Sequence, residues 1–311
     1  MLLSSRIVAA LLAALPLAAA IPPQHGSEFC VAHGSDDGRK VHAKLLASDA
    51  SIMKDVAVGT ANLVDATGFD TSIDARQAGS TAPMVFNTYV HIIQNASGTS
   101  PSAGYISRQQ IDSQIRVLNQ QYALANIAFN YVNTSYTVNT RWANAAYPGS
   151  SVEGEMIPRL RIGGRLDLNL FYIPSWRGSG YCRYPFWIGS NDQYLSIDGC
   201  MAASDSFPDG TLNRRGFLSV HEVGHWFGLL HTFDGGCSQT QGDYVADTPA
   251  EASANWETNC PVGRNTCPQL PGLDPIENHM DYSREPCKTG FTPGQAVRMR
   301  EMALLYRYAR G

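Results

Sequence analysis

The eleven residues from His221 to His231, HEVGHWFGLLH, constrain this chain more than any other feature of its sequence. On a helix, residues four positions apart share a face, so His221 and His225 can direct imidazole nitrogens at one metal ion. Gly228 can adopt a positive φ, end the helix and turn the chain so that His231 becomes a third ligand. Three neutral imidazoles leave a fourth position open for water, which is typical of a catalytic rather than a structural zinc site.

Glu222 stands one position after His221 and therefore beside the metal rather than on it. In that place a carboxylate can accept a proton from a metal-bound water and later deliver it to a leaving amine. Two histidines on an apolar helix face often belong only to a packed core. The full pattern, with the glycine and the third histidine, arises by chance in about 1 of 10⁵ chains of this composition. The segment therefore predicts one catalytic zinc ion with Glu222 as general base.

The N-terminus indicates secretion. Arg6 precedes an apolar run, and Ala18 to Ala20 offer a cleavage site, so residues 1–20 are predicted to be a signal peptide. That run is too short to span a bilayer and no later segment is long and apolar enough, so we expect a secreted, extracellular protein without a membrane partner. The sequons at Asn95 and Asn133 are compatible with glycosylation there.

The remaining chain divides into two parts. Residues 21–82 are polar with weak periodicity, which is typical of a pro-segment or N-terminal extension, although a small first subdomain is an alternative. Residues 83–311 are predicted to form one catalytic domain, and the 44% hydrophobic content is enough for a packed core. A net charge of −4 with 23 Lys and Arg residues gives no basic footprint for nucleic acid, and the oligomeric state stays open.

Periodicity predicts an α/β (α+β) fold with a mixed sheet. Strands are expected at 84–93, 128–132 and 166–173, and a helix capped by Ser107 carries an apolar face from Ile111 to Tyr122. Helical spacing recurs over 219–230, and Thr292 with Pro293 can open a C-terminal helix. The segment 233–291 has few regular patterns and carries four of the seven cysteines, which favours an irregular, cross-linked subdomain.

The pattern from His221 to His231 resembles that of the metzincin metalloproteases. The string Asn278-His-Met-Asp-Tyr282 is similar to the methionine turn of their pappalysin branch, to which ulilysin and secreted fungal metalloproteases belong. The strings 235–237 (GGC) and 245–249 (VADTP) resemble the same branch. The resemblance covers roughly residues 83–311 and implies a metzincin-like fold, zinc-dependent endopeptidase activity and protein or peptide substrates.

The same resemblance implies roles for several further residues. Met280 would form a hydrophobic floor under the zinc ligands, and Tyr282 would stabilise the oxyanion, with a buried structural tyrosine as the alternative. Residues 195–202 are the expected strand for substrate pairing, unless they form a core strand. Asp247 and Thr248 could bind calcium through their oxygens, or form an ordinary turn.

Asp243 lies close to that calcium segment in the sequence.

Six of the cysteines fall in the catalytic region and allow fifteen pairings. The resemblance favours Cys237–Cys267 and Cys260–Cys287, which leaves Cys182–Cys200 as the third pair.

Cys30, the seventh cysteine, lies in the N-terminal extension. A thiolate is a good zinc ligand, so Cys30 could occupy the fourth position and hold a zymogen inactive. Related enzymes usually have a glycine after such a cysteine, whereas Val31 follows here. The alternative is an unpaired thiol in a segment that is removed on maturation.

Taken together, these features predict a secreted zinc endopeptidase. One rival is a hydrolase whose third ligand is a downstream glutamate, for which Glu251 and Glu257 are candidates, but His231 sits at the metzincin spacing. The second rival is a catalytically inactive secreted binding module on the same scaffold. Such a module usually lacks the glutamate or a ligand, and this chain keeps both Glu222 and all three histidines.

Overall fold

The computed structural model describes residues 29–30, 82–176, 179–185, 192–209, 213–238, 242–257 and 259–308. The predicted signal peptide and most of the N-terminal extension lie outside these residues. The strands are β1 (Phe29–Cys30), β2 (Met84–Gln94), β3 (Ile127–Val138), β4 (Asp167–Ile173), β5 (Ser179–Cys182) and β6 (Cys200–Ala203). The longer helices are α3 (Arg108–Gln121), α4 (Thr140–Ala145), α5 (Ser151–Leu160), α7 (Phe217–Trp226) and α8 (Pro293–Ala303). Short helical turns are η1 (Pro101–Ala103), η2 (Ala123–Ala125), α6 (Asp192–Leu195), η4 (Ser204–Ser206), η5 (Glu285–Cys287) and η6 (Leu304–Tyr308).

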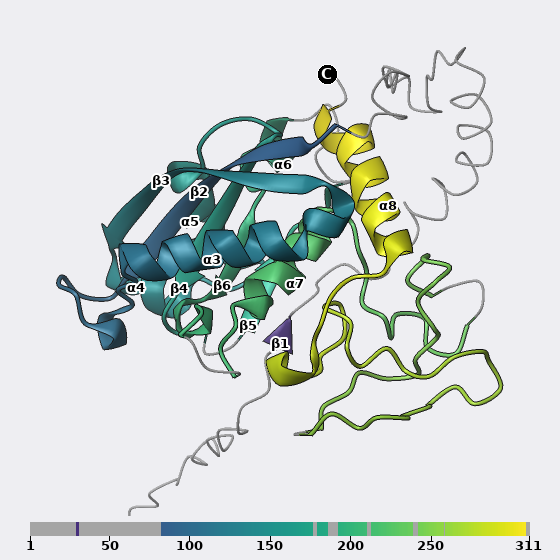
Figure 1. Ribbon diagram of the computed structural model, residues 1–311. Helices are drawn as coiled ribbons and strands as arrows, with labels where there is room; N and C mark the ends of the chain where they lie inside the picture. The colour runs from purple at the N-terminus through teal and green to yellow at the C-terminus, as the bar shows by residue number, and fades with distance from the viewer. Residues whose placement is uncertain are drawn as a thin grey trace, which may run out of the picture.

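The strands form one mixed sheet in the order β1-β5-β6-β4-β2-β3 (Figure 1). Strands β2, β3, β4 and β6 run parallel, β5 is antiparallel to β6, and β1 pairs in parallel with β5. The mixed sheet expected from the sequence is therefore confirmed. Because parallel pairs need crossover connections, the helices lie on the two faces of the sheet.

The two faces of the sheet carry separate cores. Alternate residues of β4 show this directly, since Leu170 and Tyr172 join one cluster while Phe171 and Ile173 join the other. The larger core holds α3, α7 and α8 against the sheet, and the smaller one holds α4 and α5. Helix α3 begins at a capping box formed by Ser107, as the sequence predicts.

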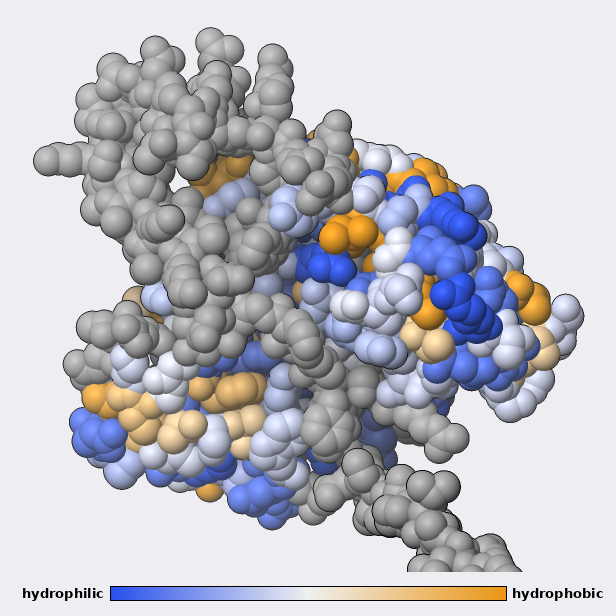
Figure 2. Space-filling model, turned by 180° about the vertical axis from the view of Figure 1, so that it is seen from behind, coloured by the Kyte–Doolittle hydropathy of each residue, from blue (hydrophilic) through white to orange (hydrophobic). Residues whose placement is uncertain are grey.

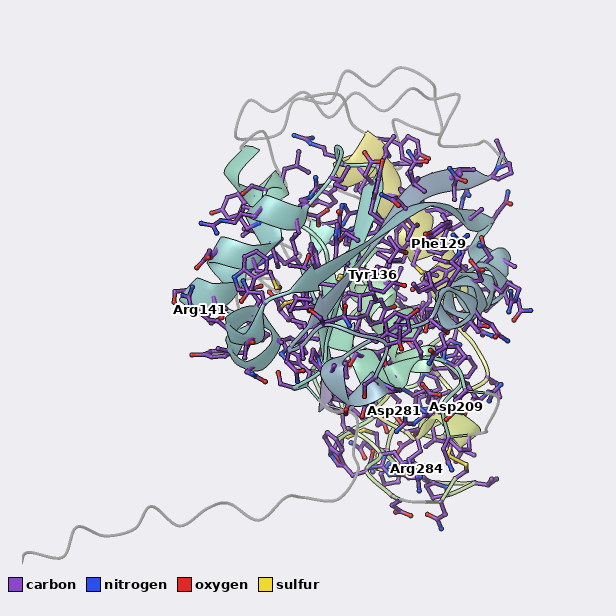
Figure 3. The ribbon with its side chains drawn as sticks, turned by 90° about the vertical axis from the view of Figure 1, so that its left-hand side faces the viewer. Phe129, Tyr136, Arg141, Asp209, Asp281 and Arg284 are labelled. Atoms are coloured by element: carbon purple, nitrogen blue, oxygen red, sulfur yellow. A yellow bond between two sulfur atoms is a disulfide. The ribbon has the colours of Figure 1, made fainter. Side chains whose placement is uncertain are left out.

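Two bodies can be distinguished in the described chain. We call residues 82–230 together with 292–308 the sheet body, and residues 231–291 the C-terminal lobe. Among the described residues of the lobe, regular structure is limited to η5 and one bridge between Asn278 and Gly290. The lobe lies below the sheet body in Figure 1, and Figure 3 shows Asp281 and Arg284 in it.

Three disulfides join described residues: the two pairs favoured by the resemblance and the third pair that they leave. Cys182–Cys200 joins β5 to β6 inside the sheet body. Cys237–Cys267 closes 30 residues of the lobe, and Cys260–Cys287 closes 27. The irregular lobe is therefore cross-linked twice, as expected for a segment with so little regular structure.

Some predicted boundaries are wrong. Residues 195–202 are not one strand, because Leu195 ends α6 and only Cys200–Ala203 form β6. The helix expected over 219–230 covers Phe217–Trp226, and β3 extends six residues beyond the predicted end at Val132.

Within the described ranges no helix is long and apolar enough to cross a membrane. The back of the molecule shows small hydrophobic areas between hydrophilic ones (Figure 2).

Candidate active site and metal centre

Helix α7 carries the first two histidines, and all ten of its residues are buried. Its N-terminus is capped from the lobe, because the Glu285 carboxylate accepts hydrogen bonds from the backbone N–H groups of Phe217 (2.7 Å) and Leu218 (3.2 Å). The helix ends as predicted at a glycine. Gly228 has φ 82°, and its N–H donates to the carbonyl of His225 (2.8 Å).

The three histidines converge at their Nε2 atoms. His225 Nε2 lies 3.2 Å from His221 Nε2 and 3.1 Å from His231 Nε2. On the far side of two rings, His221 Nδ1 is 2.7 Å from the carbonyl of His279, and His225 Nδ1 is 2.8 Å from that of Leu229. A carbonyl only accepts, so each Nδ1 carries the proton and each Nε2 keeps a lone pair.

The electrostatics of the triad favour neutral imidazoles. Burial, together with the neighbouring histidines, lowers the pKa of His225 to about 3 and that of His221 well below its usual range. Three Nε2 lone pairs that face one another repel unless a cation lies between them. The donor set therefore fits zinc, which prefers three imidazoles with one open position at a catalytic site.

Asp234 is a functional residue that the sequence reading missed. Its carboxylate accepts from the backbone N–H of His231 (3.1 Å) and lies 3.6 Å from His231 Nδ1. Burial opposes the ionisation of Asp234, but the hydrogen bonds that its carboxylate accepts from His231 outweigh it, so the pKa of Asp234 is lowered. A carboxylate behind a ligating imidazole fixes the ring and strengthens the ligand. The signal available in the sequence was an acid three residues after the third histidine.

Glu222, on α7, is fully buried and its side chain faces strand β5. The backbone of Gly180 passes so close to it that a Cβ atom there would lie 2.3 Å from Glu222 Oε1. Only glycine allows β5 to approach the carboxylate in this way. Strand β6 lies between β4 and β5 and pairs with both, so it has no free edge. The substrate-pairing role expected for residues 195–202 therefore does not fit β6. Strand β5, which we call the rim strand, pairs with β6 on one side and with β1 of the N-terminal extension on the other.

Met280 lies under the triad in a tight turn. Its N–H donates to Asn278 Oδ1 (2.9 Å), and the N–H of Asp281 donates to the Asn278 carbonyl (3.2 Å). The sulfur packs against α7 at Gly224, where a Cβ atom would lie 2.6 Å from Sδ. Gly224, the first of the two glycines in the zinc motif, is thus required because the methionine approaches closely, whereas Gly228 is required by the turn.

Aromatic rings border the triad on the side of the C-terminal lobe. The ring of Phe233 stacks on His231 at 4.8 Å, and the ring of Tyr282 lies 4.8 Å from His231 and 5.8 Å from His221. The ring of Trp256 lies 4.8 Å from that of Tyr282. Phe233 and Trp256 are additions to the residues predicted from the sequence.

The two residues expected to bind calcium lie in different surroundings. Asp247 caps α8, because its carboxylate accepts from Thr292 Oγ1 (2.6 Å) and from the N–H of Gly294 (2.8 Å). Thr248 Oγ1 instead lies 2.7 and 2.8 Å from the two carboxylate oxygens of Asp243 and 2.8 Å from the Val245 carbonyl. This oxygen cluster borders a cavity of about 600 Å³.

The other predicted residues lie as follows. Glu251 is bound to Thr232 Oγ1 (2.9 Å) and to Arg264, and the metal-ligand cluster found among the described residues contains only the three histidines. The backbone of Cys30 pairs with Gly180 of β5. Asn95 follows β2, and Asn133 lies exposed on β3.

Comparisons with known proteins agree with this geometry. A family model of the M43 peptidases, described as pregnancy-associated plasma protein-A, matches residues 179–304. An extracellular metalloprotease of Pyricularia oryzae is 46% identical over 240 residues, 76% of this chain and 79% of the relative. One of Neurospora crassa is 44% identical, over 71% of this chain and 75% of the relative. Mature mirolysin of Tannerella forsythia, solved with a cleaved peptide, superimposes with TM-score 0.58 at 24% identity, over 74% and 98% of the two chains.

Proposed function

Because this chain belongs to the M43 family of metallopeptidases, the pappalysins, we propose that His221, His225 and His231 hold its catalytic zinc and that Glu222 is the general base. The protein is an extracellular zinc endopeptidase that acts on proteins and peptides. The observation that carries the assignment of residues is the convergence of three buried Nε2 atoms beside a buried carboxylate.

Zinc held by His221, His225 and His231 would supply Lewis-acid chemistry, which polarises a carbonyl and makes water a stronger acid. Once β1 is removed with the pro-segment, the backbone of β5 binds the substrate as an added strand, because β5 is then the edge of the sheet next to Glu222. The Glu222 carboxylate accepts a proton from the attacking water and transfers it to the leaving amine. The Tyr282 hydroxyl, carried on a ring beside two ligand imidazoles, donates to the developing oxyanion. Met280 supports the ligands from below.

Replacement of the base tests this assignment. Glu222→Gln should bind one zinc per chain, as wild type does, while kcat on casein falls by about 10²- to 10⁴-fold. Glu257→Gln, at an exposed glutamate, is the matched control and should keep full activity. Normal turnover by the Glu222 variant would contradict the assigned role. A wild-type protein that binds zinc and peptide but cleaves neither casein nor a peptide library would favour the inactive binding module.

We also propose the predicted division of the chain into signal peptide (1–20), pro-segment (21–82) and catalytic domain (83–311), with Cys30 as a zymogen switch. The support is the pairing of β1 with β5, in which Cys30 stands beside Gly180, the residue that contacts Glu222. In this switch the Cys30 thiolate occupies the open zinc position, and the pairing with β5 places its backbone beside the site. The Cys30→Ser precursor lacks that ligand and should cleave peptides before processing, and a precursor as inactive as wild type would refute the switch. N-terminal sequencing of the secreted enzyme locates the maturation site.

Calcium is proposed for the oxygen cluster of Asp243, Thr248 and the Val245 carbonyl, with Asp247 holding α8 against it. These are hard oxygen donors of the kind calcium prefers. Calcium at millimolar concentration should raise the Tm of wild type and leave that of Asp243→Asn unchanged. Equal shifts of Tm in both proteins would exclude this cluster as the calcium site.

N-glycans are proposed at Asn95 and Asn133.

A further inference from the structure

Trp256 is an exposed aromatic side chain in an unusual position. Its side chain is 48% exposed, although it stands 4.8 Å from Tyr282, whose ring touches the zinc-ligand imidazoles. Burying an indole stabilises a protein by a few kcal/mol, so an exposed indole next to a reaction centre is most simply explained by a ligand that covers it. The catalytic residues and the turn assigned above do not use this side chain.

The backbone of this segment is held rigidly. The residue before Trp256, Asn255, is fully buried, and its N–H donates to Asp281 Oδ1 in the methionine turn (3.1 Å). Its side-chain Nδ2 donates to Ser283 Oγ (2.9 Å), and its Oδ1 accepts from the N–H of Glu257 (3.1 Å). Trp256 is therefore tied to the same turn that carries Met280 and Tyr282. A rigid aromatic platform loses little conformational entropy when a ligand binds it.

The position of Trp256 relative to β5 defines what it can contact. The sheet body supplies one wall of the site through β5, whose Gly180 contacts Glu222. The C-terminal lobe supplies the other wall, because the rings of Phe233 and Tyr282 contact that of His231 and the ring of Trp256 contacts that of Tyr282. A peptide paired with β5 has side chains that alternate between the two sides of its backbone. Some of them must point toward the lobe.

Building on the proposed function, we propose that Trp256 is a specificity-determining residue that stacks on a large apolar or aromatic side chain of the substrate near the scissile bond. The stacking partner is a ring or a branched aliphatic group, because these are the side chains that pack well on an indole. Tyr282 supports that indole from behind while its hydroxyl serves the reacting carbonyl. The enzyme therefore prefers substrates with an aromatic residue at one position.

The test uses the purified mature enzyme and a set of fluorogenic hexapeptides. In each peptide one position, from the third residue before the scissile bond to the third after it, is either Phe or Ala. Wild type should cleave the Phe peptide faster at one position. In Trp256→Ala that preference should fall by about 10-fold in kcat/KM, the discrimination that an apolar contact provides, while the Ala peptides keep their rates.

Trp256→Phe and Leu273→Ala complete the design. Trp256→Phe keeps a ring and should retain most of the preference, and it remains informative if the alanine variant folds poorly. Leu273 is 53% exposed in the same lobe, is not among the aromatic residues that border the triad, and its replacement should change nothing. A preference that is absent in wild type, or that is unchanged in Trp256→Ala, overturns the proposal. A wild type that cleaves no peptide, with or without Phe, would instead contradict the proposed function.

Discussion

The sheet body and the C-terminal lobe both deliver residues to the triad, but they are held in shape by different interactions. The sheet body uses backbone hydrogen bonds and two apolar cores. The lobe, where regular structure is scarce, relies more on buried charge and on two of the three disulfides. Its centre is Arg264, whose guanidinium contacts Glu251 and Asp274, and both carboxylates are fully buried.

Within the lobe, carboxylates do the work that neighbouring strands do in a sheet. The Asp274 carboxylate accepts from the backbone N–H of Thr266 (2.9 Å), and Asp281 accepts from those of Asn255 and Ser283 (both 3.1 Å). Buried N–H groups need partners, and irregular backbone finds them in side chains. An active-site wall can therefore be positioned without regular structure, provided that its polar groups are satisfied. The contrast predicts that damage to the lobe affects catalysis as well as stability.

The largest effect is expected for Arg264→Ala. It leaves two buried carboxylates without their shared cation, which should cost about 3–5 kcal/mol of unfolding free energy. Because Glu251 also holds Thr232, next to His231, kcat should fall too. Ile157→Ala, on the buried face of α5 in the smaller core, should cost about 2–5 kcal/mol but leave kcat/KM unchanged below its Tm. Denaturant unfolding and peptide kinetics on both variants test the contrast, which is wrong if kcat falls equally in both.

Removing disulfides tests the same contrast, with a somewhat smaller expected loss of unfolding free energy. Chain entropy assigns about 3–4 kcal/mol each to bridges closing loops of this length, so stability alone does not distinguish them. Activity should. Replacing Cys182 and Cys200 by alanine leaves β5 hydrogen-bonded to β6. Replacing Cys260 and Cys287 removes the covalent link between η5 and the chain four residues after Trp256, where the lobe has little regular structure to replace it. Only the second double variant should lose kcat at low temperature. Loss of kcat in the first would show that the sheet does not hold the rim strand unaided.

A third effect, of about 2 kcal/mol at pH 5, concerns His91 in the sheet body. Burial lowers its pKa to about 4, while Asn169 and Ser135 hold the ring at 3.0 and 2.8 Å. Between pH 6.5 and 4 the unfolded chain binds the proton and the folded chain does not, so the free energy of unfolding falls as pH falls through that window.

His91→Gln keeps a hydrogen-bonding side chain that does not titrate. The loss of stability between pH 7.5 and pH 5, measured by urea unfolding, should therefore be smaller in this variant than in wild type. A variant with the same pH dependence as wild type would assign the acid sensitivity to other groups.

The contrast between the sheet body and the lobe also explains which parts of the fold and the site could be predicted from the sequence. The triad, the capped helix after Ser107 and the strands β2 and β4 depend on local spacing and short-range patterns, so they were predictable. The rim strand β5 was not, because its four residues include a glycine whose role is set by Glu222 on a distant helix. A run predicted as one strand over 195–202 is split, since α6 ends inside it.

The lobe shows the limit more sharply. Its disulfide pairs followed from the resemblance to a family, whereas the contacts of Arg264 with Glu251 and Asp274 join residues 13 and 10 positions apart with no periodic pattern. Nothing in the sequence indicated that the carboxylate of Asp247, expected from the resemblance to bind calcium, accepts from Thr292, 45 residues along the chain, and so caps α8. Polar contacts of this kind depend on how the chain turns in three dimensions, and no residue pattern encodes that turn.

The smallest effect on stability is expected at the free edge of the sheet. An unpaired strand edge of this kind can pair with another molecule, and the described part of the lobe, which has little strand structure, does not present one. Strand β3 pairs only with β2 among the described strands, and Figure 3 shows it along the outer side with Phe129 and Tyr136. Asn133 is exposed on this edge, next to a β-bulge. Long exposed edges invite pairing between molecules, and a glycan there blocks it.

Asn133→Gln should therefore leave kcat unchanged and alter unfolding free energy by no more than about 0.5 kcal/mol, the usual range for a surface substitution. Its mass should fall by one glycan, and light scattering at high concentration should show more self-association. Asn95→Gln removes the other proposed glycan away from the β3 edge and should lose mass without associating. Equal association of the two variants would mean that glycans act through general solubility. Association confined to Asn133→Gln would show that the sheet body, unlike the lobe, needs its edge covered.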